Sequence, residues 1–152
     1  MEPRKICSVE KQSKRVRIQQ VDEKGKKKQL AINFQVADVQ RPLLSVKSVT
    51  DMGNRVVFSK EEKDCYIENE KTGDRLQMKK KGFGSYVLVV NFVGGKTTEI
   101  TIDSAAEESV CPWKWGEQFG VSEATEWMKL TSANGSNIKH WGERLVKFET
   151  GV

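Results

Sequence analysis

The sequence predicts an all-β, barrel-like domain. Short segments with an apolar residue at every second position recur along the chain, and turn residues such as glycine, asparagine and aspartate separate them. Closely spaced short strands of this kind are typical of a sandwich or a barrel. The 152 residues, of which 37% are hydrophobic and 31% charged, suffice for one domain with a modest core.

Two strands are expected in the first part of the chain. Residues 15–21 and 29–39 both alternate apolar and polar side chains, and a polar turn separates them. Pro42 ends the second strand. Residues 1–14 are mostly polar, so we expect a flexible N-terminal segment followed by a single domain over residues 15–152.

One short helix or turn is expected over residues 43–52. Apolar residues recur there at three- and four-residue spacing, and Gly53 follows as a natural C-terminal stop. One helical turn is also expected within residues 112–119, and residues 122–127 have the capping pattern of a helix start.

Strands account for most of the remaining chain. They are expected over residues 54–58, 64–68, 74–78, 84–93, 98–103, 128–131, 138–141 and 144–148. The segment 84–93 is almost entirely apolar, which indicates a strand that is buried or lies at an interface.

The strand over residues 98–103 delivers an aspartate into a tight turn. Ile100 and Ile102 share one face, Asp103 ends the strand, and the small residues Ser104 and Ala105 follow. A carboxylate on such a rigid loop is what two opposed aspartates need in order to hold a water between them. The structural alternative is an aspartate that only caps a turn.

Three stretches of the chain share short motifs with one protein family. They are Asp103-Ser104-Ala105-Ala106-Glu107, the segment 132–146 with Ala133-Asn134-Gly135-Ser136 and Ile138, and the segment 34–46 with Ala37-Asp38-Val39 and Leu43-Leu44-Ser45. They resemble, in turn, the Asp-(Thr/Ser)-Gly-Ala-(Asp/Glu) motif, the flap hairpin and the late Ala-Asp-Val block of gypsy-type retropepsins. Retropepsins are the aspartic proteases of retroviruses and LTR retrotransposons.

The order of these blocks differs from the order in the family. Residues 28–93 resemble the family's C-terminal half, and residues 97–152 resemble its N-terminal half with the catalytic turn and the flap. A glycine linker over residues 94–96 joins them. We therefore interpret the chain as a circularly permuted or segment-shuffled retropepsin-like domain, a closed barrel of short strands with a flap hairpin and one short helix.

The resemblance implies an aspartic endopeptidase that cuts extended polyprotein segments as a homodimer. Asp103 would be the catalytic carboxylate, and a twofold-related copy would supply the second one. Ser104 would brace the two loops, whereas Ala105 stands where the family has glycine. Because of this departure, a catalytically inactive retropepsin-like scaffold that dimerises or binds peptides remains the alternative.

The other two blocks would serve the same site. In the family the hairpin closes over the substrate, so Ala133, Asn134, Gly135, Ser136 and Ile138 are the expected substrate-binding residues. Asn-Gly is also a hairpin signal in its own right. Leu43, Leu44 and Ser45 would pack behind the catalytic turn, where Ser45 again replaces a glycine.

The net charge and the cysteines argue against other classes of function. The net charge of +5 lies partly in lysine runs at residues 26–28 and 79–81, which we interpret as solvated hairpin tips. A basic nucleic-acid-binding β-barrel is thus the weaker alternative, and nucleic acid is not the partner that we expect. The three cysteines have no metal spacing, so neither a metal nor a cofactor is expected, and their odd number fits a reducing, cytoplasmic setting. The chain has no apolar run of membrane length and no signal segment at its start.

Two further groups of residues are candidate sites. The four tryptophans, Trp113, Trp115, Trp127 and Trp141, fit core or interface packing better than a platform for stacked bases. A nucleophile pair of Cys111 and His140 is disfavoured because no orienting partner for Cys111 can be named.

Overall fold

The computed structural model describes residues 16–20, 28–132 and 134–150, so the N-terminal segment expected over residues 1–14 lies outside the described residues. Within the described ranges most residues that belong to regular elements lie in strands. The strands are β1 (Val16–Gln20), β2 (Lys28–Ala37), β3 (Leu43–Ser45), β4 (Asn54–Val57), β5 (Tyr66–Asn69), β6 (Arg75–Gln77), β7 (Lys79–Lys81), β8 (Ser85–Phe92), β9 (Thr97–Asp103), β10 (Val110–Cys111), β11 (Leu130–Thr131), β12 (Asn137–Ile138) and β13 (His140–Thr150). The helical segments are α2 (Val46–Asp51) and the 3₁₀ turns η1 (Glu62–Asp64), η2 (Gly82–Gly84) and η3 (Glu117–Phe119).

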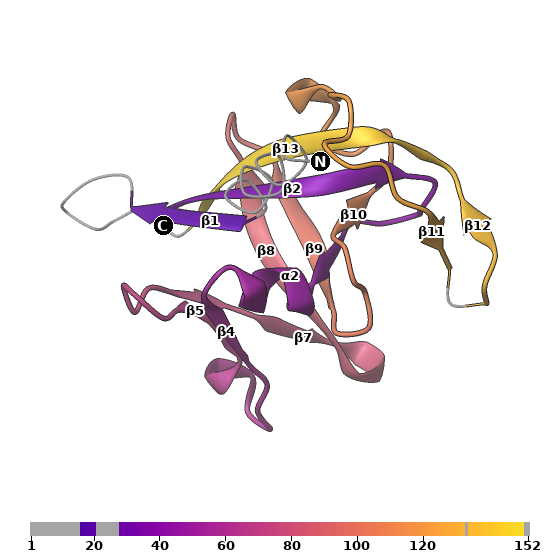
Figure 1. Ribbon diagram of the computed structural model, residues 1–152. Helices are drawn as coiled ribbons and strands as arrows, with labels where there is room; N and C mark the ends of the chain where they lie inside the picture. Colours follow the sequence, from indigo (N-terminus) through magenta and orange to yellow (C-terminus); the bar gives the residue numbers. More distant parts are fainter. Residues whose placement is uncertain (1–15, 21–27, 133, 151–152) are drawn as a thin grey trace.

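Six strands close into a ring. Their order is β2, β10, β3, β9, β8 and β13, and β13 pairs back with β2 (Figure 1). The pairs β10–β2 and β3–β9 are parallel, whereas the other pairs in the ring are antiparallel. The mostly-β, barrel-like architecture predicted from the sequence is therefore confirmed at this level.

The interior of the ring holds the core. The residues expected on one side of β2, namely Leu30, Ile32, Phe34 and Val36, are all buried. Phe92 of β8 stacks on Phe148 of β13 with ring centroids 5.5 Å apart, and Trp115 meets the edge of Phe34 at 5.0 Å. Aromatic pairs of this geometry add stabilisation beyond their buried area.

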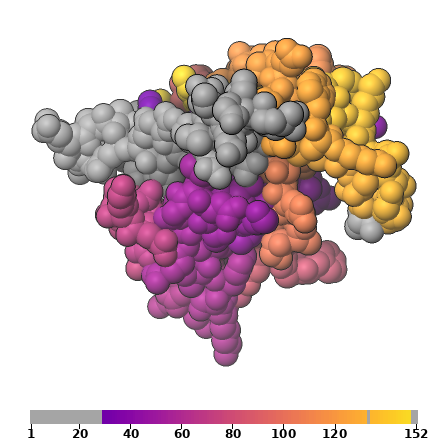
Figure 2. Space-filling view, viewed as in Figure 1, coloured from indigo at the N-terminus to yellow at the C-terminus, as the bar shows by residue number. Residues whose placement is uncertain are grey.

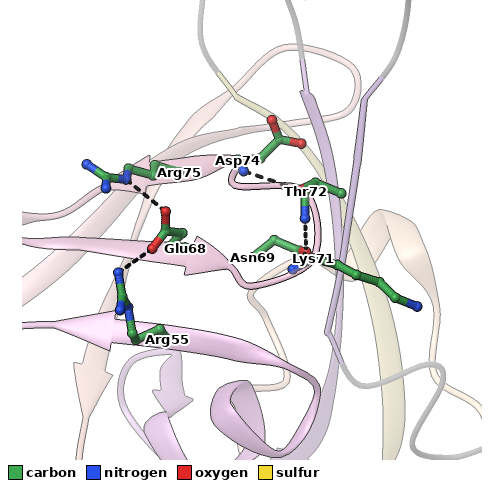
Figure 3. A network of polar contacts seen from close by, with 7 residues as sticks. All are labelled: Arg55, Glu68, Asn69, Lys71, Thr72, Asp74 and Arg75. Atoms are coloured by element: carbon green, nitrogen blue, oxygen red, sulfur yellow. Dashed lines mark hydrogen bonds and ion pairs between the residues drawn. The ribbon is translucent and has the colours of Figure 1, made fainter.

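A second, three-stranded sheet of β4, β5 and β6 lies below the ring in Figure 1. Glu68 on its central strand accepts from Arg55 at 2.6 Å and from Arg75 at 3.2 Å (Figure 3). Partial burial by itself raises the pKa of the Glu68 carboxyl, but the hydrogen bonds from Arg75 and Arg55 outweigh it, so the pKa lies below its usual value. The carboxylate therefore holds three strands together.

The turn of the β5–β6 hairpin is also held by side chains. The side-chain oxygen of Asn69 accepts from the backbone N–H groups of Lys71 and Thr72, both at 2.9 Å (Figure 3). The Thr72 hydroxyl accepts from the Asp74 N–H at 3.2 Å. These are the local contacts that make asparagine and threonine good turn residues.

The helix expected over residues 43–52 begins later than predicted. Leu43–Ser45 form strand β3 because they pair with β9, and only Val46–Asp51 are helical. Residues 122–127 contain no helix; instead Ser122 forms an isolated antiparallel bridge with Glu143. The one helical turn expected within residues 112–119 is found as η3.

Gly94 and Gly95, expected as a linker, lie in the hairpin turn between β8 and β9. Both have a positive φ, at 109° and 124°, and the Phe92 N–H donates to the Lys96 carbonyl at 2.7 Å. Only glycine adopts such angles readily. In the part of the chain that the structure describes, we find no helix with the length and apolarity needed to cross a membrane.

Candidate active-site turn

Asp103 is the last residue of β9, one of the six strands of the ring. β9 lies between β3 and β8, and Ser45 is paired with Asp103 in the parallel β3–β9 register. Ile100 and Ile102, the alternate residues of β9, are buried, whereas Asp103 is partly exposed. The strand therefore fixes the backbone of Asp103 and leaves its carboxylate accessible.

The turn after β9 has a defined conformation. One carboxylate oxygen of Asp103 accepts from the Ala105 N–H at 2.9 Å, and Ser104 and Ala105 are exposed. This contact is an Asx turn, in which an aspartate side chain bonds to the backbone two residues ahead. The Asp103 carboxylate thus lies in the exposed turn, next to two small residues.

A buried cluster of serines holds this turn from behind. The Ser45 hydroxyl donates to the Ala106 carbonyl at 2.7 Å and accepts from the Ser48 N–H at 3.1 Å, so it caps helix α2 as well. The Ser45 N–H donates to the Ser109 hydroxyl at 3.0 Å. Ser45, Ser48 and Ser109 are all nearly inaccessible. We call these three residues the serine cluster.

The apolar members of the same block, Leu43 and Leu44, lie on β3 beside the strand that carries Asp103. Leu44 is buried and Leu43 is half-buried on β3, which pairs with β9 on one side and β10 on the other. Ser48 and Ser109 were missed by sequence reasoning. A serine three residues after a possible N-cap could have indicated Ser48, whereas Ser109 carries no local signal.

The expected flap segment forms a separate hairpin of β11 and β12. Leu130 pairs with Ile138 and Thr131 with Asn137. The side-chain oxygen of Asn134 accepts from the Ser136 N–H at 2.9 Å, and Gly135 has a φ of 88°. Asn134, Gly135 and Ser136 are exposed and Ile138 is half-buried, whereas Ala133 lies outside the described residues. The hairpin projects from the body of the molecule at the right of Figure 2.

A buried polar network lies at the base of this hairpin. Glu143 accepts from the Gln35 side chain at 3.2 Å and from the Thr125 hydroxyl at 3.1 Å. His140 Nε2 lies 2.7 Å from the side-chain amide oxygen of Gln35. The Gln35 N–H also donates to the Ser109 carbonyl at 2.8 Å. Gln35 therefore contacts both the base of the hairpin and the turn that carries Asp103, which sequence reasoning did not anticipate.

Cys111 is not a nucleophile in this structure. Its side chain is fully buried, and burial raises the pKa of the Cys111 thiol to about 12, although the nearby Arg144 guanidinium acts in the opposite direction. His140 is engaged with Gln35, as described above. Within the described residues, no group of three or more histidine, cysteine or acidic side chains could hold a metal ion.

Of the four tryptophans, Trp115 and Trp141 pack against the core, whereas Trp113 and Trp127 are exposed. Trp115 joins the core, and its indole N–H donates to the Thr98 hydroxyl at 2.9 Å. Trp113 meets Trp141 edge to face at 5.5 Å, and Trp127 meets His140 at 4.8 Å. The buried Arg144 guanidinium donates to the carbonyls of Pro112, Trp113, Trp115 and Gly120, which fixes this segment on β13.

Comparison of the chain with models of known protein families, with curated proteins and with solved structures finds no match. The chemistry of the turn must therefore be inferred from its own residues. They present one accessible carboxylate at the end of a rigid strand, a hydroxyl beside it and a buried support behind it.

Proposed function

We propose that the chain is a rearranged retropepsin-like aspartic endopeptidase that hydrolyses extended polyprotein segments as a homodimer. The observation that carries the proposal is the place of Asp103. Asp103 ends β9, a strand that has a hydrogen-bonded neighbour on each side in the closed ring, and the Leu43–Ser45 strand runs parallel beside it. The motif resemblance of the turn, the hairpin and the β2–β3 block supports the same function.

The reaction needs two carboxylates. Asp103 of one copy and Asp103 of a second copy would face each other across a twofold axis and share one proton, because two like charges so close cannot both ionise. The ionised carboxylate would take a proton from a water as that water attacks the scissile carbonyl carbon. The protonated carboxylate would polarise the carbonyl oxygen.

The surrounding residues would position the reactants. The Ser104 hydroxyl, exposed next to Asp103, would brace the two turns against each other. The hairpin with Asn134, Gly135 and Ser136 would close over the substrate main chain and exclude water. An extended peptide is the substrate class that such a hairpin binds, through hydrogen bonds to its backbone.

The test is peptide cleavage by the wild-type chain and by Asp103→Asn. Asparagine has nearly the same size and can still accept from the Ala105 N–H, but it cannot act as a general base. We expect the wild type to cleave a peptide library between about pH 4 and 7, where two carboxylates that share a proton titrate. Asp103→Asn should lower the rate by at least about a thousandfold. Equal rates for the two proteins would refute the proposal.

A catalytically inactive scaffold of the same family is the second candidate. The observation that favours it is the Asx turn, since the Asp103 oxygen already has a partner in its own loop, and the Ala105 methyl group stands where the family has glycine. Under this alternative, Ala105→Gly would be needed before any cleavage is seen. Cleavage by the unmodified chain would exclude it.

A further inference from the structure

The tip of the β7–β8 hairpin exposes an aromatic side chain on a strained backbone. Phe83 lies between two glycines in η2, and its side chain is fully exposed. Its φ of 65° and ψ of 25° are left-handed, and it is the only non-glycine residue with a positive φ in the described part of the chain. Such a backbone costs a bulky residue roughly 1 kcal/mol or more. The free chain therefore gains nothing from a phenylalanine here.

This tip leaves the sheet at the same edge as the Asp103 turn. In the antiparallel β8–β9 register Tyr86 pairs with Ile102, so β8 begins beside the residues where β9 ends. Figure 1 shows the coil after β7 next to the turn that follows β9. The register therefore places the Phe83 tip at the end of the sheet where the Asp103 turn lies.

The two neighbouring segments carry opposite charges. Residues 79–84 contain three lysines and no acid, and residues 103–109 contain three acids and no base. Lys79–Lys81 are all exposed; Lys81 pairs with Glu99 at 3.0 Å and the Lys80 ammonium donates to the Lys60 carbonyl at 2.5 Å, whereas Lys79 has no charged partner within the described ranges. Glu107 is exposed in the turn. Two copies that bring their Asp103 turns together would also bring the Asp103 and Glu107 carboxylates of both turns together, which repel one another unless cations lie between them.

We propose that the Phe83 tip is a contact surface for a second copy of this chain. The inference rests on the proposed function, because that function requires two Asp103 turns to meet. In the arrangement that pairs unlike charges, Lys79 of each tip lies against Glu107 in the acidic turn of the other copy, and Phe83 is buried between them. A twofold interface makes each such contact twice.

The experiment is sedimentation equilibrium of the full chain between about 1 and 100 μM, in low and high salt. Phe83→Asn removes the ring but keeps a residue that tolerates a left-handed backbone. Val93→Asn is the matched control, because Val93 is an exposed apolar residue in the turn at the opposite end of β8. Lys79→Glu, Glu107→Lys and the double variant test the charge pairing.

The wild type should be a dimer that high salt weakens. Phe83→Asn should raise the dimer dissociation constant about tenfold or more, as loss of a buried aromatic anchor does, whereas Val93→Asn should not change it. Lys79→Glu and Glu107→Lys should each weaken the dimer, and the double variant should recover part of the loss.

Three outcomes would overturn the inference: a wild type that is monomeric throughout, a Phe83→Asn variant that dimerises as tightly as wild type, or binding of oligonucleotides at the tip without self-association. A dimer that depends on Phe83 but never cleaves peptides would support the inference and contradict the proposed endopeptidase. The two proposals can thus fail separately.

Discussion

At the scale of single residues, Ser45 links two distant segments of the chain. Its hydroxyl donates to the Ala106 carbonyl and caps helix α2, and none of it is accessible to solvent. The serine ties the Ala106 carbonyl, 61 residues further along the chain, to the start of helix α2.

We therefore expect Ser45→Ala to destabilise the protein by about 1–3 kcal/mol, because it leaves the Ser48 N–H and the Ala106 carbonyl without their buried partner. Thr50→Ala is the control, since the Thr50 hydroxyl likewise donates to a backbone carbonyl, that of Lys47, but is exposed. Urea unfolding gives both free energies. Equal losses in the two variants would show that the serine cluster does not support the turn.

Residue-level prediction from the sequence succeeded where the signal was local. The alternation of Ile100 and Ile102 placed Asp103 at a strand end, and the structure has it there. Gln35 and Ser109 were missed because their partners lie far away in the chain; Gln35 bonds to Glu143, 108 residues away, and Ser109 accepts from the Ser45 N–H, 64 residues away. Periodicity within a segment carries no information about such contacts.

At the scale of elements, Glu68 joins β4, β5 and β6 through Arg55 and Arg75 (Figure 3). The folded-state pKa of this carboxyl is lowered, so its stabilising effect is present above the unfolded-state pKa and is lost as the pH falls through the folded-state value. We expect Glu68→Gln to be less stable than wild type at pH 7. The difference should shrink as the pH falls from about 5 to 2.

Thermal melts over this pH range provide the measurement. Asp51→Asn is the matched control, because it breaks an ion pair with Lys47 at 3.0 Å that is exposed on both sides and lies on a single helix. We expect almost no change in its melting temperature. A loss in Glu68→Gln that stayed constant down to pH 2 would mean that packing, rather than charge, accounts for it.

The errors at this scale have a common cause. Residues 43–52 have apolar residues at helical spacing, but Leu43–Ser45 form a strand because β9 and β10 offer them backbone partners. β7 and β10 were not expected at all; β7 consists of three exposed lysines, and β10 has only two residues. Pairing with a neighbour outweighed the weak propensity of such short segments.

At the scale of the whole molecule, the ring determines what rearrangement the fold tolerates. β2 lies between β1 and β13, so Val16 and Val146 both pair with Ile32. Thr150 is four residues further along β13, which places it roughly 16 Å from Val16 by ordinary strand spacing. The sequence predicted a closed barrel in permuted order, but which strands are neighbours could not be read from it, since pairing is a property of distant segments.

This geometry leads to a test of the permutation. A chain that starts at Gly95, ends at Gly94 and joins Val152 to Met1 would have the turn, the hairpin and the β2–β3 block in the order of the retropepsins. The 17 residues between Thr150 and Val16 could reach up to roughly 55–60 Å when extended, so the connection is not strained. We expect the same β-rich circular dichroism spectrum and a cooperative transition in urea, with a loss of about 1–2 kcal/mol because a tight hairpin is opened and a long loop is closed.

A second permutant, cut between Leu88 and Val89, serves as the control because it interrupts a strand with buried residues on both sides of the cut. It should not fold. If the first permutant also failed, the β8–β9 turn would be essential to the ring, and the shuffled order would be a requirement of this fold. If both folded, ring closure would not depend on an unbroken β8, and the pairing of β8 with β9 and β13 would contribute little to stability.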